Sequence, residues 1–221
     1  MAGENAVRPK GFKKKVENFW YYYKYYCIIG IFLFTALVVV MAQCSRRPKY
    51  DYKVVVTTNS ADFTSIQIET LGKKLAAYGR DINGDGSVNV SVVDCTYNIK
   101  ETTYEMMMAK KQKLQSILTS EAGVLLIISD EGNYDWINSI TSGGFMENVG
   151  LPQGDGKYFT LEGTKFLNSV KEECGKNCSW PNDLRISRRI VKGTLIEKDK
   201  NIKELAQNSD ELLNKLVAEN R

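Results

Sequence analysis

Residues 25–45 read YYCIIGIFLFTALVVVMAQCS and contain no Asp, Glu, Lys or Arg. A helix rises about 1.5 Å per residue, so this stretch is about 30 Å long, which matches the hydrocarbon core of a bilayer. Its apolar side chains leave no polar stripe, and aromatic residues crowd its beginning, as lipid tails and headgroups favour. We therefore predict that residues 25–45 form a transmembrane helix embedded in the lipid bilayer.

The charge distribution predicts the orientation of this helix. Residues 1–24 carry six basic and two acidic side chains, a net charge of +4, whereas the chain after residue 45 carries 24 of each sign. Lys and Arg beside a span favour the cytoplasmic side. The sequence thus predicts a basic cytoplasmic tail over residues 1–24 and an extracytoplasmic domain over residues 46–221, in a single-pass protein of the cell membrane.

Processing at the end of the span has two interpretations. The n-region and the apolar run are both longer than those of a cleaved signal peptide, which favours an uncleaved signal anchor. The residues leading to Cys44 resemble a bacterial lipoprotein cleavage site, which would make Cys44 a lipidated residue. Gln43 stands where such a site needs a small residue, so an ordinary thiol at the membrane interface is the simpler interpretation.

Composition limits the chemistry of residues 46–221. They are enough for one domain with its own core, and their neutral balance argues against nucleic acid as a partner. The chain has no His, which excludes Ser–His and Cys–His nucleophile pairs and His-ligated metals. Outside the cytoplasm, Cys174 and Cys178 either close a small disulfide loop or remain two free thiols.

Strand and helix patterns alternate after the span. β-branched or apolar runs predict strands, and apolar residues at intervals of three and four predict helices, the first of which Ser60 or Asp62 would cap. The alternating segments are residues 50–58 (strand), 63–78 (helix), 88–95 (strand), 102–118 (helix) and 123–129 (strand). This order predicts parallel strands with right-handed crossovers.

The remaining segments complete the fold prediction. Three Arg within residues 184–191 favour a strand at a sheet edge, and residues 202–217 predict an amphipathic C-terminal helix. Shorter elements are expected at residues 134–140 (helix), 157–161 (strand) and 166–173 (helix). The fold class is α/β: an N-terminal transmembrane helix followed by a three-layer, mostly parallel-sheet α/β domain.

Polar residues follow the three parallel strands. In open α/β sheets, ligands bind in the crevice at the carboxyl ends of the strands, although polar loops there also cap helices. The candidate ligand-binding residues are Thr58, Asn59, Asp94, Ser129, Asp130 and Glu131. Asp94, Asp130 and Glu131 could also form a carboxylate pair for catalysis, but their spacing does not demand it.

Residues 81–86 read DINGDG and match the first half of a calcium loop, with candidate ligands Asp81, Asn83 and Asp85 and Gly86 at the sharp turn. The closing Glu of that motif falls on Val92, so the motif lacks its bidentate ligand. The alternative is a tight turn whose Asx side chains bond local amides. Calcium is thus a possible cofactor, and no other is expected.

Several of these stretches resemble a bacterial family of uncharacterised, singly anchored envelope proteins. They are NFWYYYKYY before the span, PKYDYKVVV at the first strand, AYGRDINGDG before the second, the apolar run ending in Asp130, and LRISR from Leu184. The family is similar in outline to one lobe of extracytoplasmic solute-binding proteins, although this chain is too short for two lobes.

Two functions follow as hypotheses. The first is a non-enzymatic, membrane-anchored extracytoplasmic domain that binds an envelope protein or a small ligand. The alternative is an anchored metal-dependent hydrolase or transferase that uses Asp94, Asp130 or Glu131. A deep pocket with converging carboxylates would favour the second, and a filled or shallow crevice the first.

Overall fold

A computed structural model describes residues 11–45, 50–175 and 178–220. The chain divides into two compact units, residues 1–48 and 49–221. The first unit contains helix α1 (Phe12–Ser45), and the second contains the remaining elements.

Helix α1 is long and apolar enough to cross a membrane. Its apolar part, Lys15–Met41, has a mean hydropathy of 2.1 and no residue buried by the protein in its most apolar window. The helix begins before the predicted span, so that the aromatic stretch is helical too, and the rings of Phe19 and Tyr23 stack one turn apart with centroids 5.1 Å from each other. The Cys44 side chain lies outside the described residues, and its lipidation stays untested.

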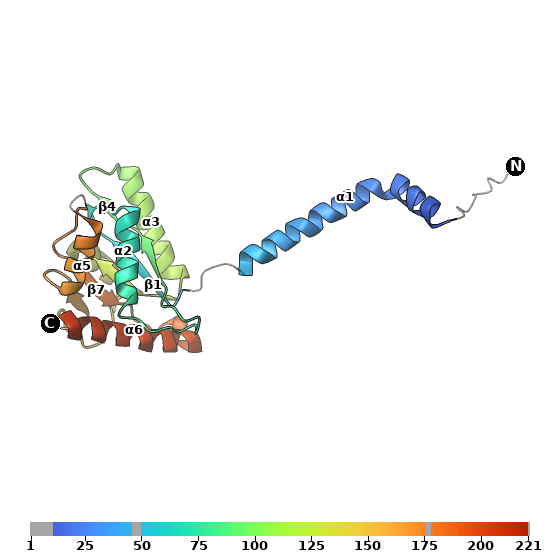
Figure 1. The fold of residues 1–221 in the computed structure, drawn as a ribbon. Coiled ribbons are helices and arrows are strands. Elements are labelled where there is room, and N and C mark those ends of the chain that lie inside the picture. Colours follow the sequence, from blue (N-terminus) through green and yellow to red (C-terminus); the bar gives the residue numbers. More distant parts are fainter. Residues whose placement is uncertain (1–10, 46–49, 176–177, 221) are drawn as a thin grey trace. The chain divides into compact units, whose positions relative to one another are not determined.

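The second unit is built on a five-stranded sheet in the order β3-β1-β5-β7-β6 (Figure 1). Its strands are β1 (Tyr52–Thr57), β3 (Val90–Asp94), β5 (Val124–Ser129), β6 (Tyr158–Thr160) and β7 (Arg185–Arg188). β1 pairs in parallel with β3 and β5, whereas β7 pairs antiparallel with both β5 and β6. The sheet is therefore mixed, and the prediction of a mostly parallel sheet is wrong for its second half.

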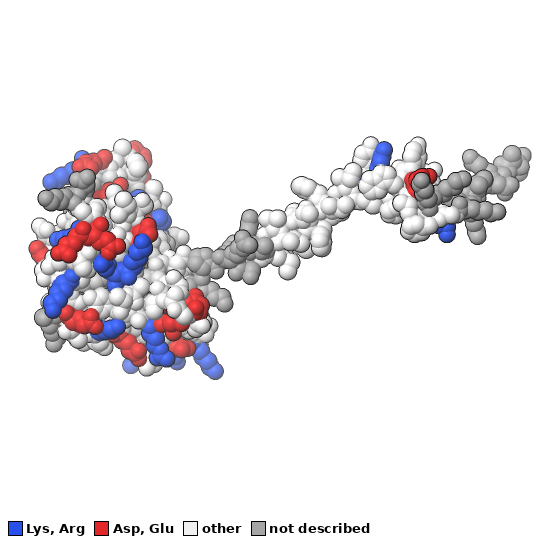
Figure 2. Space-filling model, viewed as in Figure 1, with Lys and Arg blue, Asp and Glu red and all other residues white. Residues whose placement is uncertain are grey.

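Helices cover both faces of the sheet, which confirms the α/β class. The helices are α2 (Ser65–Ala76), α3 (Tyr104–Ser120), α4 (Glu131–Asn138), α5 (Lys165–Cys174) and α6 (Lys200–Asn220), with a 3-10 turn at Leu195–Lys198. A two-stranded ribbon of β2 (Ser60–Ala61) and β4 (Tyr97–Asn98) lies beside the sheet. Both signs of charge are interspersed on the visible face of this unit, as its neutral balance requires (Figure 2).

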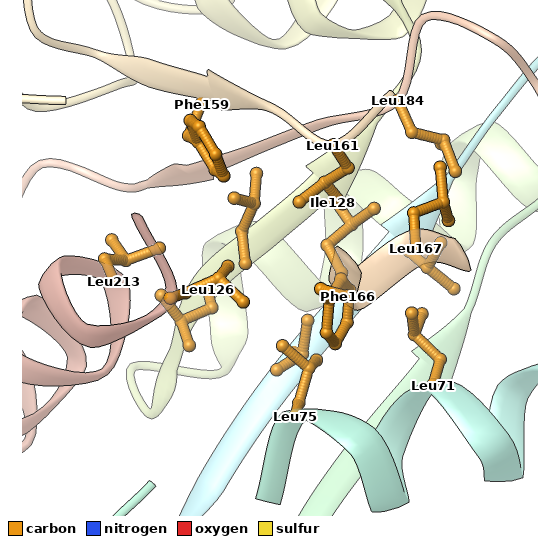
Figure 3. Packing of buried hydrophobic residues seen from close by; sticks show 14 of the residues in the cluster. Leu71, Leu75, Leu126, Ile128, Phe159, Leu161, Phe166, Leu167, Leu184 and Leu213 are labelled. Atoms are coloured by element: carbon orange, nitrogen blue, oxygen red, sulfur yellow. The ribbon is translucent and has the colours of Figure 1, made fainter. Parts of the chain in front are cut away.

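The two faces of the sheet have separate cores. Successive side chains of a strand point to opposite faces, so Val54 and Val56 of β1 pack with α2, α5 and α6, while Val55 packs with α3 and α4. Figure 3 shows the first core, where Leu71 and Leu75 of α2 approach Phe166 of α5 and Leu126 of β5. β1 and β5 are thus buried on both faces, as their continuous apolar sequences predict.

Two local predictions are wrong for identifiable reasons. The predicted edge strand 184–191 is β7, which lies between β5 and β6, because its arginines have partners inside the domain. α2 is capped by Thr64, not by Ser60 or Asp62, since Thr64 and Gln67 form a reciprocal capping box.

Candidate functional site

The carboxyl ends of β1 and β5 meet at Asp130, the residue after β5. Its carboxylate is 2% exposed and accepts hydrogen bonds from the backbone N–H of Asn59 at 2.6 Å and of Asn133 at 3.0 Å. The second bond makes Asp130 the N-cap of α4. The structure thus brings Asn59 and Asp130 together, but it uses both for internal hydrogen bonds.

Asn133 fills the rest of this space. With its amide oxygen turned toward β1, it accepts from Thr57 Oγ1 at 3.2 Å and from the N–H groups of Thr58 and Asn59 at 3.3 and 3.2 Å. Asn59 packs so closely that a Cβ on Gly132 would lie 2.8 Å from its Nδ2 atom. The crevice between β1 and β5 is therefore sealed by protein atoms.

Two other predicted residues are buried in this sealed half. Thr58 Oγ1 accepts from the N–H groups of Ser60 and Ala61 at 3.0 and 3.2 Å, which fixes the turn into β2. Ser129 Oγ is buried and has no hydrogen-bond partner among the described residues.

Burial, together with the charge of Asp130, raises the pKa of Tyr97 above its ordinary value.

Glu131 points away from Asp130. Its carboxylate accepts from Arg185 Nη2 at 2.6 Å and is largely exposed, while the Arg185 guanidinium lies 4.5 Å from the ring centroid of Tyr158. The pair thus fastens the start of α4 to β7. It also explains how β7 carries an arginine inside the sheet.

Asp94, at the end of β3, has different surroundings. It accepts from Thr96 Oγ1 at 2.6 Å and from Lys110 Nζ at 2.9 Å, and Lys113 Nζ donates to its backbone oxygen at 2.8 Å. Burial raises the pKa of Asp94, but the hydrogen bonds from Thr96 and Lys110 outweigh it and hold the pKa below its usual value. The charged carboxylate is therefore favoured first by Thr96 and then by Lys110 of α3.

An open pocket lies beside Asp94, between β4 and α3. We call it the β4–α3 pocket; its volume is about 270 Å³, and its wall is mostly apolar. It is lined by Asp62, Tyr97, Thr102, Met106, Ala109, Lys110 and Lys113. Sequence reasoning missed this pocket, because it depends on how the β2–β4 ribbon meets α3.

The three candidate catalytic carboxylates have separate partners. Asp94 bonds to Thr96 and Lys110, Asp130 to Asn59 and α4, and Glu131 to Arg185. Within the described ranges, no three His, Cys, Asp or Glu side chains are grouped to hold a metal ion. A metal-dependent mechanism would need these carboxylates to act on one ligand.

The predicted calcium loop is braced by backbone amides. Asp81 accepts from the N–H groups of Gly84 and Gly86 at 2.7 and 2.8 Å, and both glycines have left-handed φ angles of +73° and +85°. The buried Asp51 accepts from the N–H groups of Ile82 and Asn89, both at 2.8 Å. Sequence reasoning missed Asp51, which stands far from the loop in the chain.

Cys174 and Cys178 are close together as free thiols. The Cys178 thiol donates to the backbone oxygen of Cys174 at 3.3 Å. Burial, with a contribution from Cys178, raises the pKa of Cys174. Residues 176 and 177 between them lie outside the described ranges, and the disulfide stays a prediction.

Comparisons with known proteins return no family model, no curated protein and no solved structure that matches this chain.

Proposed function

We propose that this protein is a membrane-anchored, extracytoplasmic binding domain that performs no catalysis. Helix α1 spans the bilayer with the basic tail in the cytoplasm, and residues 46–221 lie outside. The uncharged stretch over residues 25–45 of α1 and the +4 charge of residues 1–24 support this topology. The resemblance to singly anchored envelope proteins agrees with it.

The β4–α3 pocket is the proposed binding site. The observation that carries the proposal is the contrast within one crevice: the part between β1 and β5 is filled by Asp130 and Asn133, while the part beside β3 remains open. Ligands of α/β sheets bind at this end of the strands. The sealed half and the separate partners of the carboxylates favour binding over hydrolysis or group transfer.

The pocket wall indicates the chemistry of the occupant. Tyr97, Met106 and Ala109 present apolar surface, and Met106 is 58% exposed. Lys110 lies at the pocket but is already neutralised by Asp94. The occupant is therefore an apolar group of limited size, either one aliphatic or aromatic side chain of an envelope protein or the apolar part of a small ligand.

Methionine-methyl NMR of the full-length chain in detergent micelles tests the binding site. We expect N-acetyl-phenylalanine amide to shift the Met106 methyl signal saturably and N-acetyl-glycine amide to leave it unchanged. Ala109→Phe fills the pocket and should abolish the shift, whereas Ala122→Phe lies away from the pocket and serves as the control. At about 20 mM probe, binding with a Kd of about 1 mM would be easily seen. The absence of a saturable shift at that concentration would overturn the assignment of this pocket as the binding site.

Labelling of intact cells tests the topology separately. A membrane-impermeant amine reagent should modify Lys203, which is exposed on α6, and should leave the tail lysines unmodified until the membrane is opened. Modification of the tail lysines alone would show that the N terminus lies outside, opposite to the proposed orientation.

A further inference from the structure

The two edge strands of the sheet, β6 and β3, differ in whether other chain segments cover their outer sides. β6 is covered on its outer side, because the Gln153 N–H donates to the Tyr158 oxygen at 3.2 Å and the Gln153 side chain accepts from the Thr160 N–H at 3.3 Å. At the opposite edge, no strand of the described chain lies outside β3. Residues 88–94 of that edge contain no Pro, Lys or Arg, the residues with which proteins commonly protect an open edge.

The backbone groups that β3 leaves open can be assigned. The Asn89 oxygen accepts from Tyr52 N, and Cys95 N donates to the Val56 oxygen, so the odd-numbered residues of β3 face β1. Backbone groups alternate along a strand. Val90 and Val92 therefore direct their N–H and C=O groups away from the sheet.

A groove accompanies this open edge. It has a volume of about 390 Å³ and lies between β3 and the outer side of α2, which we call the β3–α2 groove. Gly72 brings α2 close to the strand, since a Cβ there would lie 3.2 Å from the Val90 oxygen. The groove occupies the position that the helix-facing side chains of one more strand would fill.

We propose that a second copy of this chain docks here, through antiparallel pairing of β3 with its symmetry mate about a twofold axis at Val90. Each β3 supplies the hydrogen-bonding edge that the other lacks, and Val88 of one copy lies opposite Val92 of the other. Such a contact is self-complementary, as a twofold interface requires.

Charge complementarity supports a second copy as the occupant. The axis at Val90 passes beside Gly72 and runs α2 antiparallel to its mate. Glu69 and Lys73 lie in the groove wall and pair with each other on one helix at 2.7 Å. They are centred on position 71, one residue from Gly72, so each comes near the oppositely charged residue of the mate. The small Ala76, which also lines the groove, allows the two helices to approach to about 8–10 Å.

The sheet register places the two chain entries close to the twofold axis. Tyr52 is in register with Val90, so an axis at Val90 puts the first residues of the two β1 strands at the same height. Three strand spacings separate them, which is about 14 Å. An axis at the end of β3 would instead displace the two chain entries along the strands.

Energy transfer between donor- and acceptor-labelled full-length chains in lipid vesicles tests the proposal. We expect self-association that Val90→Pro weakens at least 10-fold, because it removes the two N–H groups that bond across the axis, each worth about 1 kcal/mol. Within each chain the Val90 N–H points away from β1, so Val90→Pro keeps the β1–β3 pairing. Val90→Ala loses the side chain but keeps the N–H, and we expect it to weaken association by less than about 3-fold.

A charge exchange provides an independent measurement if Val90→Pro lowers the melting temperature. Glu69→Lys places lysines opposite each other at both ends of the α2 pair and should weaken association, while the double variant E69K/K73E should restore it. Glu204→Lys, on an exposed part of α6, is the matched control. The proposal would be overturned if wild-type chains showed no energy transfer. It would also be overturned if the transfer survived both Val90→Pro and Glu69→Lys, because association would then use another surface.

Discussion

The two halves of one crevice show how sheet position decides the use of a carboxylate. Asp94 ends one parallel strand and Asp130 follows another at the same end of the sheet, yet Asp130 is sealed under α4, and Asp94 lies beside an open pocket. β5 has a strand on both sides, so its end is surrounded by chain. β3 has a neighbour on one side, and long lysine side chains from α3 supply the missing contacts.

The largest expected effect is that of removing the sealed carboxylate. Asp130→Ala should lower the free energy of unfolding by about 3 kcal/mol, because it removes the cap of α4 and the shorter of the two hydrogen bonds that the Asn59 N–H donates. Asp130→Asn keeps one acceptor oxygen and should cost about half as much. Urea unfolding of the full-length chain in micelles, followed by Trp fluorescence, measures both, and a loss below about 1 kcal/mol would contradict the sealed-crevice description.

The same truncation in the open half should cost less. Asp94→Ala is expected to lower the free energy of unfolding by about 1 kcal/mol, since its ion pair with Lys110 is partly exposed and solvent weakens it. The same urea experiment measures this loss. Equal losses for Asp94→Ala and Asp130→Ala would remove the distinction between the two halves.

The pH dependence gives a smaller but more specific signal for Asp94. Its pKa in the folded protein lies below the ordinary value, so its stabilising contribution is complete above about pH 4 and is lost as the pH falls through the folded pKa. The stability difference between wild type and Asp94→Asn should therefore narrow from pH 5 to pH 3. A constant difference would show that the Asp94 charge is not the stabilising feature.

The calcium loop extends the comparison to a third acidic cluster. Its side chains are bonded to backbone amides, so we expect melting temperatures in 1 mM calcium and in chelator to agree within about 1 °C. Calcium bound with a Kd of about 10 µM would stabilise the fold by about 2.7 kcal/mol at that concentration, a shift of several degrees. Such a shift would establish the loop as a metal site.

The smallest effect is expected at Cys95, directly after Asp94. Burial raises its pKa to about 11, and it is 1% exposed. Alkylation by iodoacetamide at pH 8 should be at least about 100-fold slower at Cys95 than at the half-buried Cys178, as measured by peptide mass spectrometry. Fast modification of Cys95 would show that the β4–α3 pocket reaches deeper than its lining residues.

Elements with a strong apolar pattern could be predicted from the sequence. The run Val124–Ser129 predicts a strand buried on both faces, and it is the fully buried β5. The apolar positions of the last segment predict α6 with the correct inward residues, such as Leu212 and Leu216. In both, burial of apolar side chains decides the structure, and the sequence displays it directly.

Features that depend on distant partners could not be predicted. The arginines of β7 indicated an exposed edge, because Glu131 and Glu147, which pair with them, lie far away in the chain. In the crevice, Asn133 was missed although its spacing from Asp130 is that of a helix cap, a signal that was available. The pocket beside Asp94 needs the β2–β4 ribbon, whose strands are too short to leave a pattern.

The central position of β1 has a mechanical consequence. Tension transmitted along the chain from α1 would enter the second unit at Tyr52, at the start of a strand held on both sides by parallel neighbours. Such a pull shears both ladders at once instead of unzipping them one bond at a time, and Asp51 adds its amide bonds at the point of entry. The fold is thus arranged to resist unfolding by a force applied through the chain that leads from α1.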